Sequence, residues 1–312
     1  MRPPKVAIVM ATYNGENYLK AQVESIIGQS YSDWSLYCSD DGSSDRTLSL
    51  LTVAQSSDRR IKVLPPRGGD KGHVGNFEYL LNHALETGAD WIFLADQDDV
   101  WFSEKLQVLL SLVECSAAPP LAAFSDLELI NDEGVSVGSF MSKHGFEGEC
   151  SVAQLLRRNS VVGCSMLLHR ELLELALPFP DKLENHDWWL GLCAATTGRL
   201  TYTAQKLVRY RQHSNNAIGV GVSVSRLTSF LSVLRRQRRV FLSKLVAVEE
   251  LMRRLEVRGE TVPEELITLN RQFKGVAGWG GCKKLITSEF KPDTKVFFLV
   301  QLLAISPLIS DD

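Results

Sequence analysis

The stretch that most constrains this chain is an apolar run that ends in a cluster of carboxylates, residues 91–101 (WIFLADQDDVW). A continuous apolar run predicts a strand buried on both faces, as in a parallel sheet. Ligands of open α/β sheets lie beyond the carboxyl ends of such strands. We therefore expect Asp96, Asp98 and Asp99 to lie where a ligand binds. The alternative is a solvated acidic turn in which Asp98 or Asp99 caps the following helix.

Carboxylates placed this closely in the chain repel one another unless a cation neutralises them. Their oxygens suit Mg²⁺ or Mn²⁺, ions that proteins commonly share with a phosphate group. The cluster therefore predicts a divalent metal ion, Mn²⁺ or Mg²⁺, at the end of this strand.

Further apolar runs precede and follow this one, at residues 6–11, 34–39, 61–64 and 121–126, with helical patterns between them. Strands that alternate with helices at this spacing predict βαβ units and a parallel sheet. Later in the chain we expect an irregular loop over 131–150, a strand over 161–168 and a helix over about 184–197. Two short strands, 200–203 and 207–210, complete the expected elements.

Polar residues follow the first two strands as well: Thr12, Tyr13 and Asn14 after one, Asp40 and Asp41 after the other. The first units of a doubly wound sheet commonly form a nucleotide pocket. The first strand is not followed by GxGxxG, and the chain has no GxxxxGK[ST], which argues against a nicotinamide cofactor and P-loop ATP hydrolysis. We expect instead a nucleotide whose diphosphate a metal ion bridges to carboxylates, with the base and ribose held by Tyr13 and Asp41.

Composition and charge narrow the class of partner. A net charge of −3 with 45% hydrophobic residues is typical of a soluble globular protein and indicates no general affinity for nucleic acid. The six cysteines form no CxxC pair, which favours free thiols in a reducing compartment. The N-terminus leads directly into a strand and no run reaches the length of a spanning helix, so we expect a cytoplasmic protein. The sequence leaves the oligomeric state open.

The chain changes character beyond residue 221, and we expect two domains, 1–221 and 222–312. Residues 223–312 hold fifteen Lys and Arg against ten Asp and Glu, and residues 226–244 interleave basic with apolar side chains at helical spacing. This extension predicts either an amphipathic element on the inner face of the plasma membrane or a helical cap packed on the first domain.

Three short motifs in the first half of the chain follow one another in an order and spacing seen in a known family: residues 11–15 (ATYNG), 39–45 (SDDGSSD) and 94–99 (LADQDD). Together they resemble family 2 glycosyltransferases of the GT-A fold. Residues 185–189 (NHDWW) and 210–213 (YRQH) look most like bacterial rhamnosyltransferases of cell-surface polysaccharide assembly. The resemblance implies a GT-A fold, a Rossmann-like and mainly parallel sheet flanked by helices. The C-terminal helical extension lies outside the shared region.

The resemblance also implies roles for individual residues. Asp98 would bind the metal ion directly, with Asp96 and His213 as further ligands. The nucleotide-sugar donor would be bound by Thr12, Tyr13, Asn14, Glu16, Asp41, Lys71 (or Arg67), Asp96 and Arg211. Alternatives stay open for single residues: an Asx-turn for Asp41, an ordinary ion pair for Arg211, and a histidine without a ligand role for His213.

Asp187 is the expected general base, which takes the proton from the acceptor hydroxyl as that oxygen attacks the anomeric carbon. A carboxylate beside Trp188 and Trp189 is partly desolvated, and this makes it a better base. Asp187 could instead cap the helix that follows it, and Glu184 is the second choice of base. The two tryptophans are candidates for acceptor binding by sugar stacking, although core packing is the commoner fate of such a pair.

The predicted activity is an inverting, metal-dependent sugar transfer from dTDP-L-rhamnose, or from a UDP-hexose, to a glycan or lipid-linked acceptor. A nucleotidyltransferase on a similar sheet is a second hypothesis, but the loop after the first strand lacks the Gly-rich, basic composition it needs. A non-catalytic glycan-binding protein is a third. Retention of the carboxylates argues against it.

Overall fold

A computed structural model describes residues 3–68, 72–115, 120–146, 148, 150–212 and 228–276. The chain divides into two compact units. The first consists of residues 1–150, 160–179 and 185–220, and the second of 151–159, 180–184 and 221–312. Two short inner segments therefore group with the C-terminal part. The division into domains at residue 221 stays a prediction.

The first unit alternates strands and helices in the order that the apolar runs predict. Its elements are β1 (Val6–Thr12), α1 (Leu19–Ile27), β2 (Trp34–Asp40), α2 (Thr47–Ser57), β3 (Ile61–Val63), α3 (His73–Glu86), β4 (Trp91–Asp96), β5 (Val100–Trp101), α4 (Lys105–Glu114), β6 (Ala122–Ile130), β7 (Ser136–Ser139), α5 (Phe140–Lys143), the 3-10 turn η1 (Gly163–Ser165), β8 (Met166–His169), α7 (Arg170–Ala176), α8 (His186–Thr196) and β9 (Leu200–Arg211).

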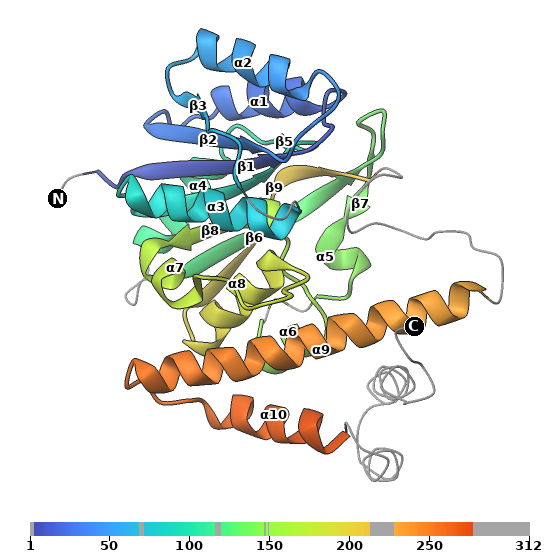
Figure 1. Cartoon of the computed structure of the whole chain (residues 1–312). Helices are drawn as coiled ribbons and strands as arrows, with labels where there is room; N and C mark the ends of the chain where they lie inside the picture. Colours follow the sequence, from blue (N-terminus) through green and yellow to red (C-terminus); the bar gives the residue numbers. More distant parts are fainter. Residues whose placement is uncertain are drawn as a thin grey trace. The chain divides into compact units, whose positions relative to one another are not determined.

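A single mixed sheet runs through this unit in the order β3-β2-β1-β4-β8-β6-β9-β5, with β7 on β6 (Figure 1). The strands β1 to β4 pair in parallel, and β6 also pairs in parallel with β9. Strand β8 is antiparallel to both its neighbours, β4 and β6. The predicted α/β class, a sheet flanked by helices, is confirmed. The parallel register brings the carboxyl ends of β1, β2 and β4 to one edge.

Helices cover both faces of the sheet, which explains why β1 and β4 are buried almost throughout. One core cluster joins Val6, Ile8 and Met10 of β1 to apolar residues of α1, α2 and α4. Helix α3 buries Phe77 and Leu80 and lies in front of the sheet in Figure 1. Strands enclosed in this way need apolar residues on both faces, as the runs at 6–11 and 91–95 supply.

The predicted strand over 161–168 is wrong in its first half. Ser165 donates through both its backbone N–H and its hydroxyl to the Val162 carbonyl, and this closes the 3-10 turn η1 before β8 begins at Met166. The two strands expected at 200–203 and 207–210 form one strand, β9. The pairing of β9 with β6 changes register on either side of Asp126, and these shifts accommodate the exposed residues between the two expected strands.

The expected irregular loop over 131–150 contains two ordered elements, β7 and α5. Asp126 organises them, because its carboxylate accepts from the Ser139 hydroxyl (2.6 Å) and from the Met141 amide (3.1 Å). Ser139 in turn caps α5 by accepting from the Ser142 amide. Such a connection between distant residues leaves no periodic signal in the sequence.

The second unit contains α6 (Val152–Arg157), α9 (Thr228–Val257) and α10 (Glu264–Val276). Helix α9 buries Ala247, Val248, Leu251 and Leu255, a helical stripe. The Lys244 ammonium donates to the Leu156 carbonyl at 3.1 Å, and burial lowers the pKa of Lys244 to about 8. No helix among the residues described here is long and apolar enough to cross a bilayer. Membrane association of the extension stays a prediction.

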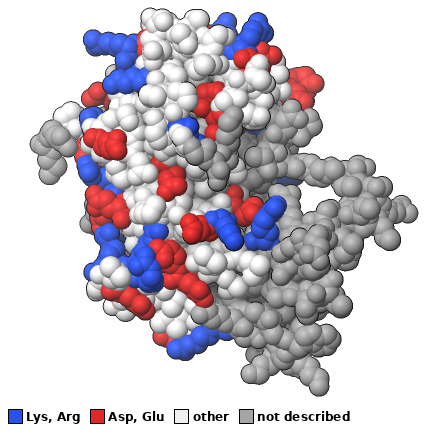
Figure 2. Space-filling view, in the orientation of Figure 1, with Lys and Arg blue, Asp and Glu red and all other residues white. Residues whose placement is uncertain are grey.

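Surface charges are paired locally. Arg209 with Glu128, Arg199 with Glu171, and Arg253 with Glu250 are examples from three different elements. On the face shown in Figure 2, basic and acidic side chains of the described residues are interspersed. Exposed pairs of this kind contribute little to stability, so the stability of the fold comes mainly from the apolar core.

Truncation of a central strand residue tests this core. Ile8→Ala should lower the free energy of unfolding by about 2–5 kcal/mol, because Ile8 is fully buried between layers and leaves a cavity. Urea denaturation measures the loss. Val53→Ala, at a position 68% exposed on α2, is the control and should change stability little. Equal effects of the two substitutions would contradict the layered core.

Candidate active site

The loop after β1 is tied to the loop after β2. Asn14 adopts a left-handed backbone conformation (φ 47°), which asparagine tolerates better than most residues. The backbone N–H of Asn14 donates to the Ser43 hydroxyl (2.8 Å), and its side-chain oxygen accepts from the backbone N–H of Ser44 (2.9 Å). Thr12 is buried and its carbonyl accepts from the Asp41 amide. Tyr13 is 56% exposed, so its ring is available to a ligand at this edge.

Asp41 is held by the segment that precedes α3. One of its oxygens accepts from the Arg67 guanidinium at 3.1 Å, and the other accepts from the Gly72 amide at 2.6 Å. A Cβ on Gly75 would lie 2.9 Å from the Arg67 guanidinium, so this glycine makes room for the pair. The alternative of a simple Asx-turn fits Asp40 instead, which accepts from the amides of Gly42 and Ser43. Lys71 lies outside the described residues.

Glu16 faces the start of α2 rather than the other strand ends. Its carboxylate accepts from the backbone and the side chain of Arg46 at 3.1 and 3.0 Å. The Glu16 amide donates to Asp45, which also accepts from Thr47 in the first turn of α2. These contacts join the β1 loop to a helix N-terminus, and they occupy the Glu16 carboxylate, which the sequence assigns to donor binding.

Gln97 is a site residue that the sequence did not reveal, because it occupies the variable middle position between Asp96 and Asp98. Its side-chain oxygen accepts from the Tyr13 amide at 2.9 Å, and its side-chain nitrogen donates to the Tyr13 carbonyl at 2.8 Å. A Cβ on Gly15 would lie 2.2 Å from the Gln97 oxygen. The acidic loop and the Tyr13 loop are thereby joined, and the join requires glycine at position 15.

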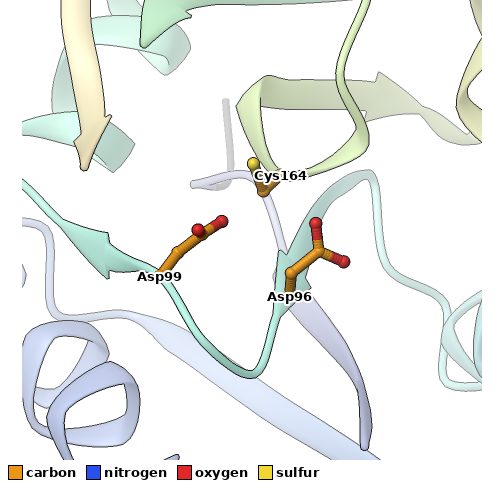
Figure 3. Close-up of side chains that lie close together, drawn as sticks. All are labelled: Asp96, Asp99 and Cys164. Carbon is orange, nitrogen blue, oxygen red and sulfur yellow. The ribbon is translucent and has the colours of Figure 1, made fainter. Parts of the chain in front are cut away.

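Asp96 and Asp99 face a common space with Cys164 of η1 (Figure 3), and one ligand atom of each lies within 4.8 Å of the others. Burial, followed by the charges of Asp98 and Asp187, raises the pKa of Asp96 to about 7. Burial, followed by the charges of Asp98 and Asp96, raises the pKa of Asp99 well above its ordinary value. One Asp99 oxygen is buried without a hydrogen-bond partner among the described residues. The cluster is short of positive charge.

Lys105 supplies part of that charge and was not predicted. Its side chain is 0% exposed, its ammonium donates to the Cys164 carbonyl at 2.6 Å, and it lies 3.2 Å from the centroid of the Trp101 ring. Burial lowers the pKa of Lys105 to about 7, against the opposing effect of the nearby acidic groups. A signal was present in the sequence, because Lys105 shares a helical face with Leu109 and Val113.

Arg211 holds the acidic loop in place. Its backbone amide donates to the Asp99 carboxylate, and its guanidinium donates to the carbonyls of Asp98, Asn131 and Asp132. The guanidinium also lies over the Tyr18 ring, 4.7 Å from its centroid. These contacts connect the end of β4 to the β6–β7 turn. His213 lies outside the described residues.

Asp187 lies in the first turn of α8 beside the acidic cluster. Its carboxylate accepts from the Gly163 amide at 3.3 Å and from the Trp188 amide at 2.6 Å. Asn185, not Asp187, is the capping residue of α8, so the capping alternative does not hold. Because Gly163 precedes Cys164, η1 brings Asp187 next to the Asp96 cluster. The charge of Asp187 contributes to the raised pKa of Asp96.

The remaining acceptor-side candidates need correction. Trp188 and Trp189 are buried, and the Trp189 indole donates to the Ala176 carbonyl at 2.9 Å. Neither indole offers a free face to an acceptor sugar in this structure, because helix α8 packs them into the core. Glu184, the second choice of base, pairs with Arg239 at 2.9 Å within the second unit.

The donor set at the β4 end fits a hard divalent cation. Among the described residues, the ligand atoms that lie close together belong to Asp96, Asp99 and Cys164, so two of the three groups are carboxylates. Asp98, the expected direct ligand, is not in this group, but its charge adds to the effect of burial in raising the pKa of Asp96. The third group of this cluster, the Cys164 thiol, is a soft donor, which hard cations do not favour. Mg²⁺ or Mn²⁺ suits these residues better than a thiolate-bound metal such as Zn²⁺.

The sheet, with its parallel first strands and the carboxylates at the end of β4, is that of a glycosyltransferase of the GT-A fold. The sequence model described as Glycosyl transferase family 2 matches residues 7–118. A beta-1,3-glucosyltransferase of Escherichia coli, WfgD, is 31% identical over 189 residues, which are 60% of this chain and 69% of that protein. The chain belongs to glycosyl transferase family 2.

Other relatives agree with this assignment. The dTDP-rhamnosyl transferase RfbG of Shigella flexneri is 29% identical over 243 residues, 73% of this chain and 80% of the relative. Among solved structures, TarS residues 1–349 of S. aureus in complex with UDP-GlcNAc has a TM-score of 0.61 at 14% identity, covering 98% of this chain and 82% of that one. A mannosyltransferase of Pyrobaculum calidifontis, PcManGT, with GDP-Man and Mn²⁺, has a TM-score of 0.56 at 14% identity, with 99% and 82% covered. At these identities the two structures show the fold alone.

The clamp between Gln97 and Tyr13 can be tested without a substrate. Gln97→Ala removes both hydrogen bonds, so the Tyr13 amide should exchange with solvent several-fold faster, in line with about 0.5–1.5 kcal/mol for each bond. Hydrogen–deuterium exchange measures this. Gln107→Ala, on the exposed face of α4, is the control and should leave the Tyr13 amide unchanged. Unchanged exchange in Gln97→Ala would contradict the clamp.

Proposed function

We propose that this chain is an inverting, divalent-metal-dependent glycosyltransferase of polysaccharide biosynthesis. It moves a sugar from a nucleotide-sugar donor to a glycan or lipid-linked acceptor. The observation that carries the proposal is the meeting of Asp187 with the carboxylates at the β4 end, two motifs separated by about ninety residues of chain. A base and a diphosphate-binding site must be adjacent for a single displacement at the anomeric carbon.

The donor that we propose is dTDP-L-rhamnose, with a UDP-hexose as the alternative. Support for rhamnose comes from the motifs at 185–189 and 210–213 and from the relative RfbG, a dTDP-rhamnosyl transferase. Support for a UDP-hexose comes from the relative WfgD, which uses UDP-Glc. The acceptor of WfgD, a GlcNAc-diphosphoundecaprenol, makes a lipid-linked acceptor the first to examine here. In this proposal the protein acts in the cytoplasm, close to membrane-bound acceptors.

The nucleoside would lie over the loop after β1. Tyr13 is exposed there, and its backbone is fixed by Gln97. Asp41 and Arg67 form a charged pair at the neighbouring strand end, where Asp41 can accept from the ring N–H of uracil or thymine once the Gly72 amide or Arg67 yields. Thr12, Asn14 and Glu16 act indirectly in this proposal, because their contacts hold the loop.

Asp96 and Asp98 would hold the metal ion, with His213 as a further candidate ligand. When bound, such an ion would offset the negative charge that develops on the departing diphosphate. In the absence of the ion, the fold holds these carboxylates together at a cost in electrostatic repulsion. The positive charge of Lys105 partly compensates this cost. Arg211 keeps the loop that carries these residues against β9 and the β6–β7 turn.

Asp187 would take the proton from the acceptor hydroxyl while that oxygen attacks the anomeric carbon from the face opposite the diphosphate. One displacement inverts the configuration. The amides of Gly163 and Trp188 hold the carboxylate in a fixed orientation, and the N-terminus of α8 favours its ionised form. A positioned base of this kind accounts for about a 10²–10⁴-fold increase in rate.

Substitution of the base tests the proposal. Asp187→Asn keeps the shape and one acceptor oxygen but cannot take a proton, so kcat for transfer should fall by about 10²–10⁴-fold. Release of nucleoside diphosphate from dTDP-L-rhamnose or UDP-glucose, with the GlcNAc-diphospholipid as acceptor, measures it. Glu174→Gln, on the exposed side of α7, is the control. Full activity of folded Asp187→Asn would contradict the assignment of the base.

Metal binding should depend on pH with a defined sign. The pKa of Asp96 is raised to about 7, so its proton stabilises the metal-free fold, and this contribution is lost as the pH rises from about 4 through 7. Mn²⁺ competes with that proton. The Mn²⁺-induced rise in Tm should therefore be larger at pH 8 than at pH 6, measured by differential scanning fluorimetry.

The control for the metal experiment is Asp96→Asn, in which the difference between the two pH values should shrink. A Tm shift that is equal at both pH values in the wild type, or larger at pH 6, would contradict Asp96 as a ligand. Loss of turnover in EDTA and its recovery with Mn²⁺ would complete the test of the proposed metal dependence.

A further inference from the structure

His186 is a buried polar group that the proposed mechanism does not use. It is the first residue of α8 and directly precedes Asp187. The residue is only 7% exposed, and within the described part of the chain neither Nδ1 nor Nε2 has a hydrogen-bond partner. Buried polar atoms are nearly always paired, because an unpaired one loses its water without compensation. An imidazole with both nitrogens unpaired therefore needs an explanation.

The ring is held from the side of α3. It stacks on Phe77, with ring centroids 4.0 Å apart and planes 22° from parallel, and His73 lies edge-on at 5.9 Å. On the side of η1, a Cβ on Gly163 would lie only 3.2 Å from Nε2. The Phe77 ring on one side and the missing side chain at Gly163 on the other hold the imidazole with Nε2 next to the turn that positions Asp187.

The surroundings keep this imidazole neutral. Burial, followed by the nearby His73, lowers the pKa of His186 to about 3. The N-termini of α3 and α8 both lie next to the ring, and positive helix ends disfavour an imidazolium. A neutral imidazole has one N–H donor and one acceptor nitrogen. This pair matches a hydroxyl group, which also donates and accepts, and is poorly suited to a phosphate, which only accepts.

We propose that His186 hydrogen-bonds a sugar hydroxyl of the reacting substrates, beside the base Asp187, and so helps to select the sugar. This inference rests on the proposed glycosyl transfer. The hydroxyl belongs either to the transferred sugar or to the acceptor, and the same chemistry serves both. A leucine would fill this apolar niche without leaving unpaired atoms, so a merely structural residue at this position has no need of two ring nitrogens.

Two variants separate a substrate contact from a packing role. His186→Leu removes both polar atoms, so the Tm of the full-length protein should stay equal or rise, while kcat/KM for transfer should fall by about three- to tenfold, the range expected for one lost neutral hydrogen bond. His186→Gln restores a donor and an acceptor and should recover part of the lost activity. His83→Gln, on α3 but away from Asp187, is the matched control and should behave as the wild type.

Two assays identify which sugar carries the hydroxyl. With dTDP-L-rhamnose or UDP-glucose alone, slow donor hydrolysis reports on the donor, and addition of the GlcNAc-diphospholipid reports on transfer. If the hydroxyl is on the donor, His186→Leu slows both reactions. If it is on the acceptor, only transfer slows, through a higher KM for the acceptor. Both results support the contact.

The outcomes also separate this inference from the function on which it rests. A wild-type protein that turns over neither donor overturns the proposed function and the contact with it. An active wild type whose folded His186→Leu variant has unchanged kcat/KM overturns the contact alone. A variant with reduced activity and a strongly reduced Tm, not recovered by His186→Gln, shows a packing role and overturns it as well.

Discussion

The crowding of carboxylates at the end of β4 is the constraint on which the rest of the site depends. Asp96 and Asp99 are pressed into a poorly solvated space, where their mutual repulsion is strong and their pKa values rise. The fold tolerates this because the Lys105 ammonium lies near both carboxylates and the Arg211 guanidinium donates to the backbone of the same loop. The remaining deficit of positive charge is what a divalent cation and its diphosphate partner would use.

Around this cluster the loops are joined to one another rather than left separate. Gln97 joins the acidic loop to Tyr13, Asn14 joins the Tyr13 loop to the loop after β2, and Arg67 joins that loop to the start of α3. A ligand at any one of these loops therefore meets a surface whose neighbours are already positioned. Preorganisation of this kind reduces the ordering cost of binding.

The side of the proposed site that would bind the acceptor depends on a different feature, the close approach of α8 to η1. Gly163 permits the approach, donates to Asp187 and leaves the niche in which His186 lies. The tryptophans that follow in the sequence provide the buried anchor of α8. The sequence makes Trp188 and Trp189 candidates for sugar stacking, with core packing as the commoner alternative, and in the structure both are packed in the core.

The sequence alone determined the elements whose signal is local. Apolar runs located β1, β2, β3, β4 and β6, and the motifs around Asp41, Asp96 and Asp187 were sufficient to indicate a family 2 glycosyltransferase, because strand ends and motif order are properties of short segments. Tertiary structure decided which of those residues meet. The Gln97 clamp, the pairing of Asp41 with Arg67, the buried Lys105 and the unpaired ring of His186 all depend on contacts between segments far apart in the chain. No local pattern records such contacts, since they are settled by how the sheet and its helices pack.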